Sequence, residues 1–211
     1  MFDEFPFEET IMAEALVIKD TTANPAPLGL FAFGMTTILL NLHNAGYFGM
    51  NALILAMGIF FGGMAQVIAG VLEWKKNNTF GATAFTAYGC FWLLLVAALF
   101  INLVHPAWDF EAPANKGSFA AFLILWGLFT FGLFLGTFRL SGALVVVFGS
   151  LTLLFFLLAA CQSPSASTGL KHFTGFEGVF CGASACYAGL AAVLNEVYGR
   201  TVLPIMPLAK R

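Results

Sequence analysis

The stretch from residue 141 to residue 161 reads SGALVVVFGSLTLLFFLLAAC and carries no charged side chain. A transmembrane helix needs about 20 consecutive, mostly apolar residues to cross about 30 Å of hydrocarbon. This stretch is long and apolar enough, and Arg139 and the polar Gln162 mark its two ends. It therefore predicts one membrane crossing.

The same test finds five more crossings along the chain. The breaks between them carry charged residues, except near Gly46 and Gly49, where His43, Asn44 and the two glycines are the evidence for a turn. One broken helix is the alternative there, but the combined run is too long for a single crossing. The sequence therefore predicts an all-α, polytopic membrane protein, a bundle of six transmembrane helices. The five further segments lie approximately at residues 28–45, 50–72, 80–103, 119–138 and 175–197.

The composition argues against several other classes of protein. Of the 211 residues, 60% are apolar and 9% are charged, whereas a soluble domain carries roughly 25% charged residues. The formal charge of −2 provides no basic surface for nucleic acid. The four cysteines form no CxxC motif, so neither a metal site nor a disulfide framework is indicated, and we expect no cofactor. A soluble enzyme, a nucleic-acid-binding protein and a secreted disulfide scaffold are poor fits.

The basic residues predict how the bundle is oriented, because Lys and Arg favour the cytoplasmic side of a membrane. With six crossings, seven of the nine basic residues fall on the side that holds both termini, which predicts cytoplasmic termini. We expect residues 1–23 to form an acidic, solvated tail with a short interfacial helix near residues 11–18. Residues 24–204 then form the transmembrane domain, and residues 205–211 form a short basic tail.

A row of polar side chains follows the first crossing. Phe33, Thr37, Asn41 and Asn44 are spaced by four, four and three residues, which places them on one helix face. Polar groups facing lipid would be left unsatisfied, so this face should turn inward. Packing against polar partners and lining a pathway explain it equally well. Further inward-facing candidates are Gln66, Thr86, Tyr88, Ser150, Thr152, Ser184 and Asn195.

The string NPAPLGL at residues 24–30 begins the first crossing. Asn24 is a favourable N-cap, and proline is favoured in the first helical turn. A helix N-terminus also attracts anions, so Asn24 marks either an anion site or a plain helix start.

Ionisable side chains are almost absent from the predicted crossings, where only Glu177 and Glu196 occur, each near an end. A pump or a tightly coupled antiporter keeps a charged relay near the midplane. The sequence therefore favours a protein that lets a small solute pass over a pump or a tightly coupled antiporter. Three glycine pairs spaced by four residues, at 58 and 62, 132 and 136, and 178 and 182, predict close helix packing within or between protomers.

Further short motifs follow NPAPLGL along the chain: FGMTT at residues 33–37, NLHN at 41–44, AMGIF at 56–60, GATAFTAY at 81–88, LWG at 125–127, CGASA at 181–185, VLNE at 193–196 and GRTVLP at 199–204. Together these motifs resemble those of the acetate uptake transporter family, the succinate–acetate permeases. The resemblance implies a six-helix protomer, a homo-hexamer in the bacterial inner membrane, and a pathway within each protomer. Acetate and small carboxylates such as succinate would pass, either as through an anion channel or by symport with protons.

The resemblance also implies roles for single residues. A hydrophobic constriction of the family corresponds to Phe33, Tyr88 and Leu151, and Ala185 occupies a position where side-chain size selects the acid. The remaining pathway candidates, chosen from the polar residues above, are Asn24, Thr37, Asn41, Asn44, Gln66, Thr86 and Ser184. Among the constriction residues Tyr88 alone could donate a hydrogen bond. Glu177 departs from the family pattern, because a typically apolar residue stands there.

Two other functions remain open from the sequence. An apolar constriction without charge also suits a channel for small neutral solutes such as urea or ammonia. A membrane sensor that transports nothing is the second alternative. As partners we expect acetate, succinate and related small carboxylates, protons, membrane lipid and other copies of this chain, and no nucleic acid.

Overall fold

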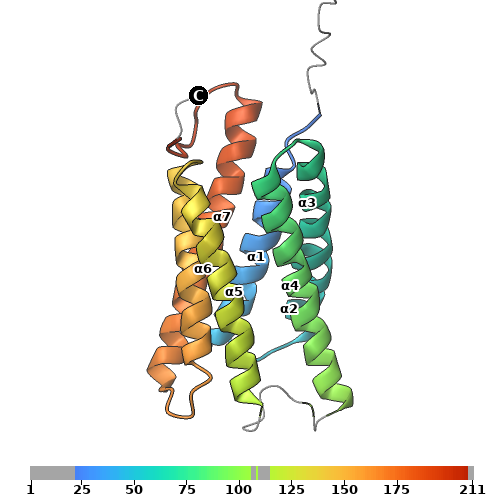
Figure 1. Ribbon diagram of the computed structural model, residues 1–211, viewed down its shortest axis with the longest axis vertical. Coiled ribbons are helices and arrows are strands. Elements are labelled where there is room, and N and C mark those ends of the chain that lie inside the picture. Colours follow the sequence, from blue (N-terminus) through green and yellow to red (C-terminus); the bar gives the residue numbers. More distant parts are fainter. Residues whose placement is uncertain (1–21, 106–107, 109–114, 209–211) are drawn as a thin grey trace, which may run out of the picture.

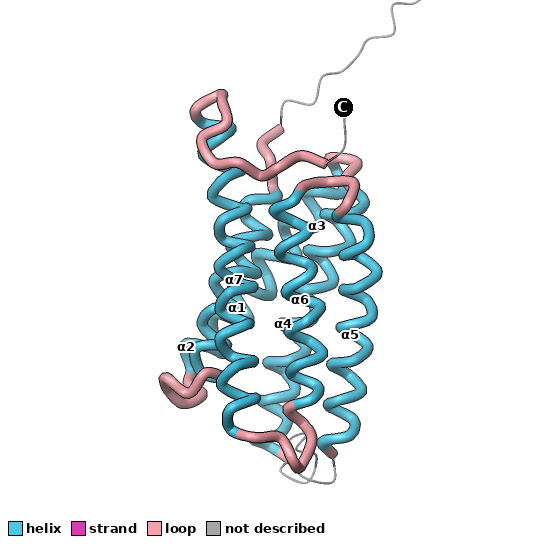
Figure 2. Tube along the Cα trace, turned by 90° about the vertical axis from the view of Figure 1, so that its left-hand side faces the viewer, coloured by secondary structure: helices cyan, strands magenta, loops and turns pink. Residues whose placement is uncertain are grey.

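The computed structural model describes residues 22–105, 108 and 115–208. These residues form a bundle of long helices that run side by side (Figures 1 and 2). Six helical segments are long and apolar enough to cross a membrane, which confirms the predicted six-helix, all-α architecture for the described part of the chain. The elements are α1 (Ala26–Asn44), α2 (Ala52–Met57), η1 (Gly58–Ala65), α3 (Gln66–Lys75), α4 (Thr79–Val104), α5 (Lys116–Thr137), α6 (Gly142–Ala160) and α7 (Thr168–Val197).

The second crossing is made of three consecutive elements. α2, η1 and α3 form one continuous span from Ala52 to Lys75. Its middle part, η1, is a π-helix, in which hydrogen bonds reach one residue further than in an α-helix. Such segments are rare and occur frequently at functional sites.

Short polar side chains set where several helices begin. The Asn51 carboxamide oxygen accepts hydrogen bonds from the backbone N–H groups of Leu53 and Ile54 and caps α2. Gly46, in the preceding turn, has a φ of +88°, a conformation that favours glycine. The first two crossings are therefore separate helices, as the sequence predicts. Ser141 and Ser167 cap α6 and α7 in the same way.

Two helix ends differ from the prediction. α7 begins at Thr168, where Ser167 caps it, and not near residue 175, so Lys171 and His172 are helical. Glu177 consequently lies about 14 Å along the helix, well away from its start. α3 continues to Lys75, which includes Glu73 in the span. The Asn78 amide donates a 2.7 Å hydrogen bond to the Glu73 carboxylate, so this charge is accommodated in a buried position that its sequence context does not reveal.

Glycines let α1 and α7 approach closely. A β-carbon at Gly34 would lie 2.6 Å from the Gly182 carbonyl oxygen, and one at Gly178 would lie 2.1 Å from Asn41 Cγ. Gly58 and Gly62 give η1 similar contact with α1 and α4. Gly132 is different, because no described residue of its own chain lies within 4 Å of the β-carbon position. Two of the three predicted glycine pairs therefore pack helices within one protomer.

The C-terminal segment is tied to the start of α6. The backbone N–H groups of Gly142 and Ala143 donate to the carbonyls of Met206 and Ile205, at 2.7 and 3.1 Å. These bonds satisfy donors that a helix N-terminus leaves free. Residues 22 and 208 lie at the same end of the bundle, which we call the tail end (Figure 1). The opposite end, which carries residues 45–51 and 161–167, is called the loop end. The interfacial helix predicted at residues 11–18 lies outside the described residues.

Candidate functional site

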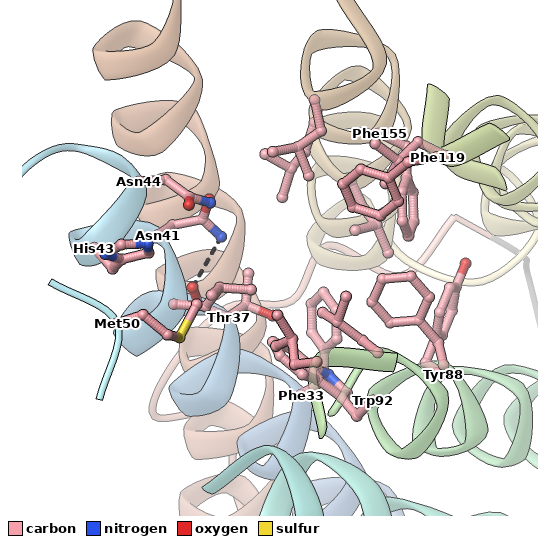
Figure 3. A pocket seen from close by; sticks show the side chains of 18 of the residues that line it. Phe33, Thr37, Asn41, His43, Asn44, Met50, Tyr88, Trp92, Phe119 and Phe155 are labelled. Carbon is pink, nitrogen blue, oxygen red and sulfur yellow. Dashed lines mark hydrogen bonds between the residues drawn. The ribbon is translucent and has the colours of Figure 1, made fainter. Parts of the chain in front are cut away.

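A cavity of about 170 Å³ lies between α1, α4, α5 and α6 (Figure 3). We call it the large cavity. It reaches from Phe33, midway along α1, toward Met50 and Gln162 at the loop end. Its walls are mostly aromatic and aliphatic, and a few polar groups lie along one side, as is typical of a small-molecule site. The polar lining residues are Thr37, Asn41, His43, Asn44 and Gln162.

A second cavity of about 20 Å³, the small cavity, lies closer to the tail end. Phe33, Tyr88 and Leu151 line both cavities. All three side chains are buried, and the ring centroids of Phe33 and Tyr88 are 6.0 Å apart. These residues therefore form an apolar wall between the two spaces. The small cavity has room for about one water molecule, so a solute as large as acetate does not fit on the tail-end side of these residues in this structure.

Tyr88 contributes its ring to this wall, while its hydroxyl bonds elsewhere. The hydroxyl donates to Thr130 Oγ1 at 2.9 Å, and the Thr130 hydroxyl donates to the Trp126 carbonyl at 2.7 Å. In Figure 3 the Tyr88 oxygen points away from Thr37 and Asn41. The hypothesis that Tyr88 donates a hydrogen bond at the constriction is therefore wrong for this structure, because the proton is already used on α5.

The polar face predicted on α1 lines the large cavity. Thr37, Asn41 and Asn44 lie along one side of this cavity (Figure 3). The Asn41 amide donates to the Thr37 carbonyl at 2.9 Å, and the Asn44 amide donates to Asn41 Oδ1 at 2.9 Å. These bonds orient both amides. The Thr37 hydroxyl is buried and has no hydrogen-bond partner among the described residues.

Gln66 lies on the other side of the wall. It is buried at the junction of η1 and α3, lines the small cavity, and its Oε1 has no partner among the described residues.

His43, which the sequence singles out only as evidence for a turn, lies at the loop end of the large cavity. Its Nδ1 is 2.8 Å from the Phe48 carbonyl oxygen.

The remaining predicted residues line neither cavity. Asn24 is exposed and accepts from the Ala26 backbone N–H at 3.1 Å, the geometry of a plain helix start. Thr86 packs on Gly70 at the outer side of α4. Ser184 donates to the Cys181 carbonyl of its own helix at 2.7 Å. Ala185 is fully buried in the apolar cluster that also holds the wall residues.

Much of the lining of the large cavity could not be predicted from the sequence. Trp92 lines it, is 4% exposed, and has an indole N–H without a partner among the described residues. Leu123 and Phe155 also line it. In segments that are apolar on every side, nothing distinguishes such residues from those that face lipid. An intramembrane Trp is the one available signal, because its N–H needs a partner.

The bundle and its two aligned cavities define a multi-pass membrane protein of the channel and transporter class. The chain belongs to the GPR1/FUN34/yaaH family, whose model matches residues 7–210. It is 55% identical over 183 residues to the succinate-acetate/proton symporter SatP of Escherichia coli (strain K12), covering 87% of this chain and 95% of the relative.

A solved structure described as that of the bacterial acetate channel SatP superposes with a TM-score of 0.81. It is 55% identical and the match covers 87% of this chain and 99% of that chain. Among the more distant relatives, the ammonia transport outward protein 2 of Saccharomyces cerevisiae is 34% identical over 182 residues, which cover 82% of this chain and 64% of the relative.

Proposed function

We propose that this protein passes acetate and small carboxylates such as succinate across a membrane, through a pathway inside each protomer. The observation that carries the proposal is that Phe33, Tyr88 and Leu151 line both cavities and separate them. The names of the E. coli relative and of the solved structure support the choice of substrate. The three residues act as the constriction, and the large cavity acts as the vestibule on its loop-end side.

The wall determines how a carboxylate can cross. An unpaired carboxylate is strongly disfavoured in a dry apolar constriction. Two routes remain: the ion crosses with part of its water shell when the wall widens and wets, or the neutral acid crosses. Passage of the neutral acid carries one proton with each carboxyl group. Either route requires side chains around the small cavity, such as Phe33 or Leu151, to move, because that cavity has room for only about one water molecule.

The experiment is uptake of labelled acetate into proteoliposomes, with voltage and pH gradient imposed separately. We expect saturable uptake that unlabelled succinate competes for. Uptake that follows voltage indicates the hydrated ion, and uptake that follows only the pH gradient indicates the neutral acid or symport. The absence of acetate flux under both gradients would overturn the proposal.

Ammonia is the second candidate, because the yeast relative is named for ammonia transport and a small neutral solute suits a narrow apolar wall. Ammonia or urea flux that acetate does not inhibit, in vesicles that take up no acetate, would favour this function.

We further propose how the protein is oriented in the membrane and how its protomers assemble. Lys75, Lys76, Arg139 and Arg200 lie at the tail end, against Lys116 and Lys171 at the loop end. The positive-inside rule therefore favours a cytoplasmic tail end, in a bacterial inner membrane. The family resemblance supports a homo-hexamer, and the open space beside Gly132 leaves room for contact with a neighbouring protomer. Modification of a cysteine introduced next to Lys76 by a membrane-impermeant reagent, from outside intact cells, would contradict this orientation.

A further inference from the structure

Two buried hydrogen-bond donors in the large cavity have no partner among the described residues. They are the Thr37 hydroxyl and the Trp92 indole N–H, on side chains that are 2% and 4% exposed. One comes from α1 and the other from α4, and both residues line the same cavity as Phe33 (Figure 3). The amides of Asn41 and Asn44, in contrast, each already donate a hydrogen bond within α1.

The π-helix η1 holds the indole in this position. A β-carbon at Gly62 would lie 2.9 Å from Trp92 Cγ, and one at Gly58 would lie 3.6 Å from Trp92 Cε3. Gly62 therefore leaves room that the indole occupies, whereas a β-carbon at Gly58 would make an ordinary contact with it. Trp92 also meets the Phe91 ring edge-on, with centroids 6.0 Å apart. The ring is fixed by packing, and its N–H has no acceptor among the described residues.

A buried donor without an acceptor is expensive. Leaving one unpaired costs about 1–3 kcal/mol, and buried Trp N–H groups usually find a partner. A phenylalanine would fill much of the same space without that cost. Two such donors beside the constriction therefore point to a ligand that brings its own acceptor atoms.

We propose that the Trp92 indole N–H and the Thr37 hydroxyl form a two-donor site for one carboxylate group, next to the constriction. This inference rests on the proposed function and adds the residues that recognise the substrate. The residues that line the large cavity include no Lys or Arg, so the site binds through neutral donors and releases its ligand readily. Neither donor atom reaches solvent in this structure. The carboxylate therefore binds when the wall side chains move, and binding favours the widened state.

The direct test follows the indole resonance of Trp92 in the full chain by ¹H–¹⁵N NMR in nanodiscs. The resonance is assigned by its loss in Trp92→Phe. We expect a saturable downfield shift of its proton on addition of sodium acetate and no shift with sodium chloride. The Thr37→Val variant, which keeps the shape of the side chain and removes the donor, should weaken this titration. A Trp92 resonance that acetate does not shift would overturn the site.

Transport provides the second readout, with two matched controls. Trp92→Phe and Thr37→Val should each raise the KM for acetate by about 3- to 10-fold, the loss of one hydrogen bond, and should not lower Tm. Trp126→Phe removes an indole that does not line the cavity, and Thr36→Val removes the neighbouring buried hydroxyl. Both controls should keep the wild-type KM, and equal effects in test and control variants would contradict the inference.

The two proposals fail in different ways. If the wild-type protein transports acetate but the Trp92 resonance and both test variants are unaffected, the site is wrong and the proposed function stands. If acetate shifts the resonance but no vesicle takes up acetate, the site stands and the proposed function is wrong.

Discussion

The hydroxyl of Tyr88 stabilises the contact between α4 and α5, because it donates to Thr130 Oγ1. Tyr88→Phe should therefore lower the free energy of unfolding by about 0.5–1.5 kcal/mol and leave the acetate flux of folded protein unchanged. The phenyl ring still completes the wall, and Thr130 keeps its bond to the Trp126 carbonyl. Thermal unfolding in detergent and flux in proteoliposomes measure the two effects. Slower flux at an unchanged Tm would show that the hydroxyl acts on the substrate.

Glu177 is a second residue whose environment makes a specific prediction. Both of its carboxyl oxygens are buried without a partner among the described residues. Replacing an unsatisfied buried group by an apolar one removes a penalty of about 1–3 kcal/mol, so Glu177→Leu should raise Tm. Glu196→Leu, at an exposed position of the same helix, is the control and should have little effect. A lower Tm for Glu177→Leu would mean that a group outside this chain, such as one from a neighbouring protomer, holds the carboxyl.

At the scale of elements, the close approach of α1 and α7 depends on glycine. Gly178→Ala places a β-carbon 2.1 Å from Asn41 Cγ, on a side chain whose amide is already bonded to α1. We expect a clear loss of Tm and of the yield of folded protein, since overpacking costs about 1–3 kcal/mol. Gly132→Ala is the control, because its β-carbon would meet none of the residues that the structure describes. Unchanged stability of Gly178→Ala would show that the two helices are not tightly packed there.

The sequence predicts the number and type of these elements well, because each membrane crossing is a long stretch of high hydropathy. It predicts their ends less well. Glu73 and Lys171 are charged and look like loop residues, but both lie in helices. The Asn78 amide accommodates Glu73, and Ser167 caps α7 early, and both effects depend on side-chain geometry. The π-helix η1 has no hydropathy signature at all.

The residues of the candidate site, too, could be predicted only in part from the sequence. The spacing of Thr37, Asn41 and Asn44 places them on one helix face, and the structure brings all three to the cavity. Singly placed residues are harder to assign, because one polar side chain does not reveal which way it faces. Thr86 packs on Gly70, and Ser184 bonds to its own helix. Trp92 could not be predicted to line the cavity, because its neighbours in α4 are apolar or aromatic.

At the scale of the whole molecule, the bundle holds two neighbouring cavities that share an apolar wall formed by Phe33, Tyr88 and Leu151. The residues that line the two cavities include neutral polar side chains and no Lys or Arg. Under the proposed function, a carboxylate that meets no fixed cation is held weakly, and we expect the width of the wall to decide which acids pass. The size of Leu151, which lines both cavities, should therefore set the range of substrates.

The most direct test of this account compares Leu151→Ala with Leu153→Ala in one flux assay. Leu151 is 4% exposed in the wall, whereas Leu153 lies two residues further along α6 and is 48% exposed. We predict that Leu151→Ala admits bulkier acids such as lactate several-fold faster relative to acetate, and that Leu153→Ala retains the wild-type ratio of lactate to acetate flux. A wild-type ratio in Leu151→Ala, measured on folded protein, would contradict the assignment of the constriction.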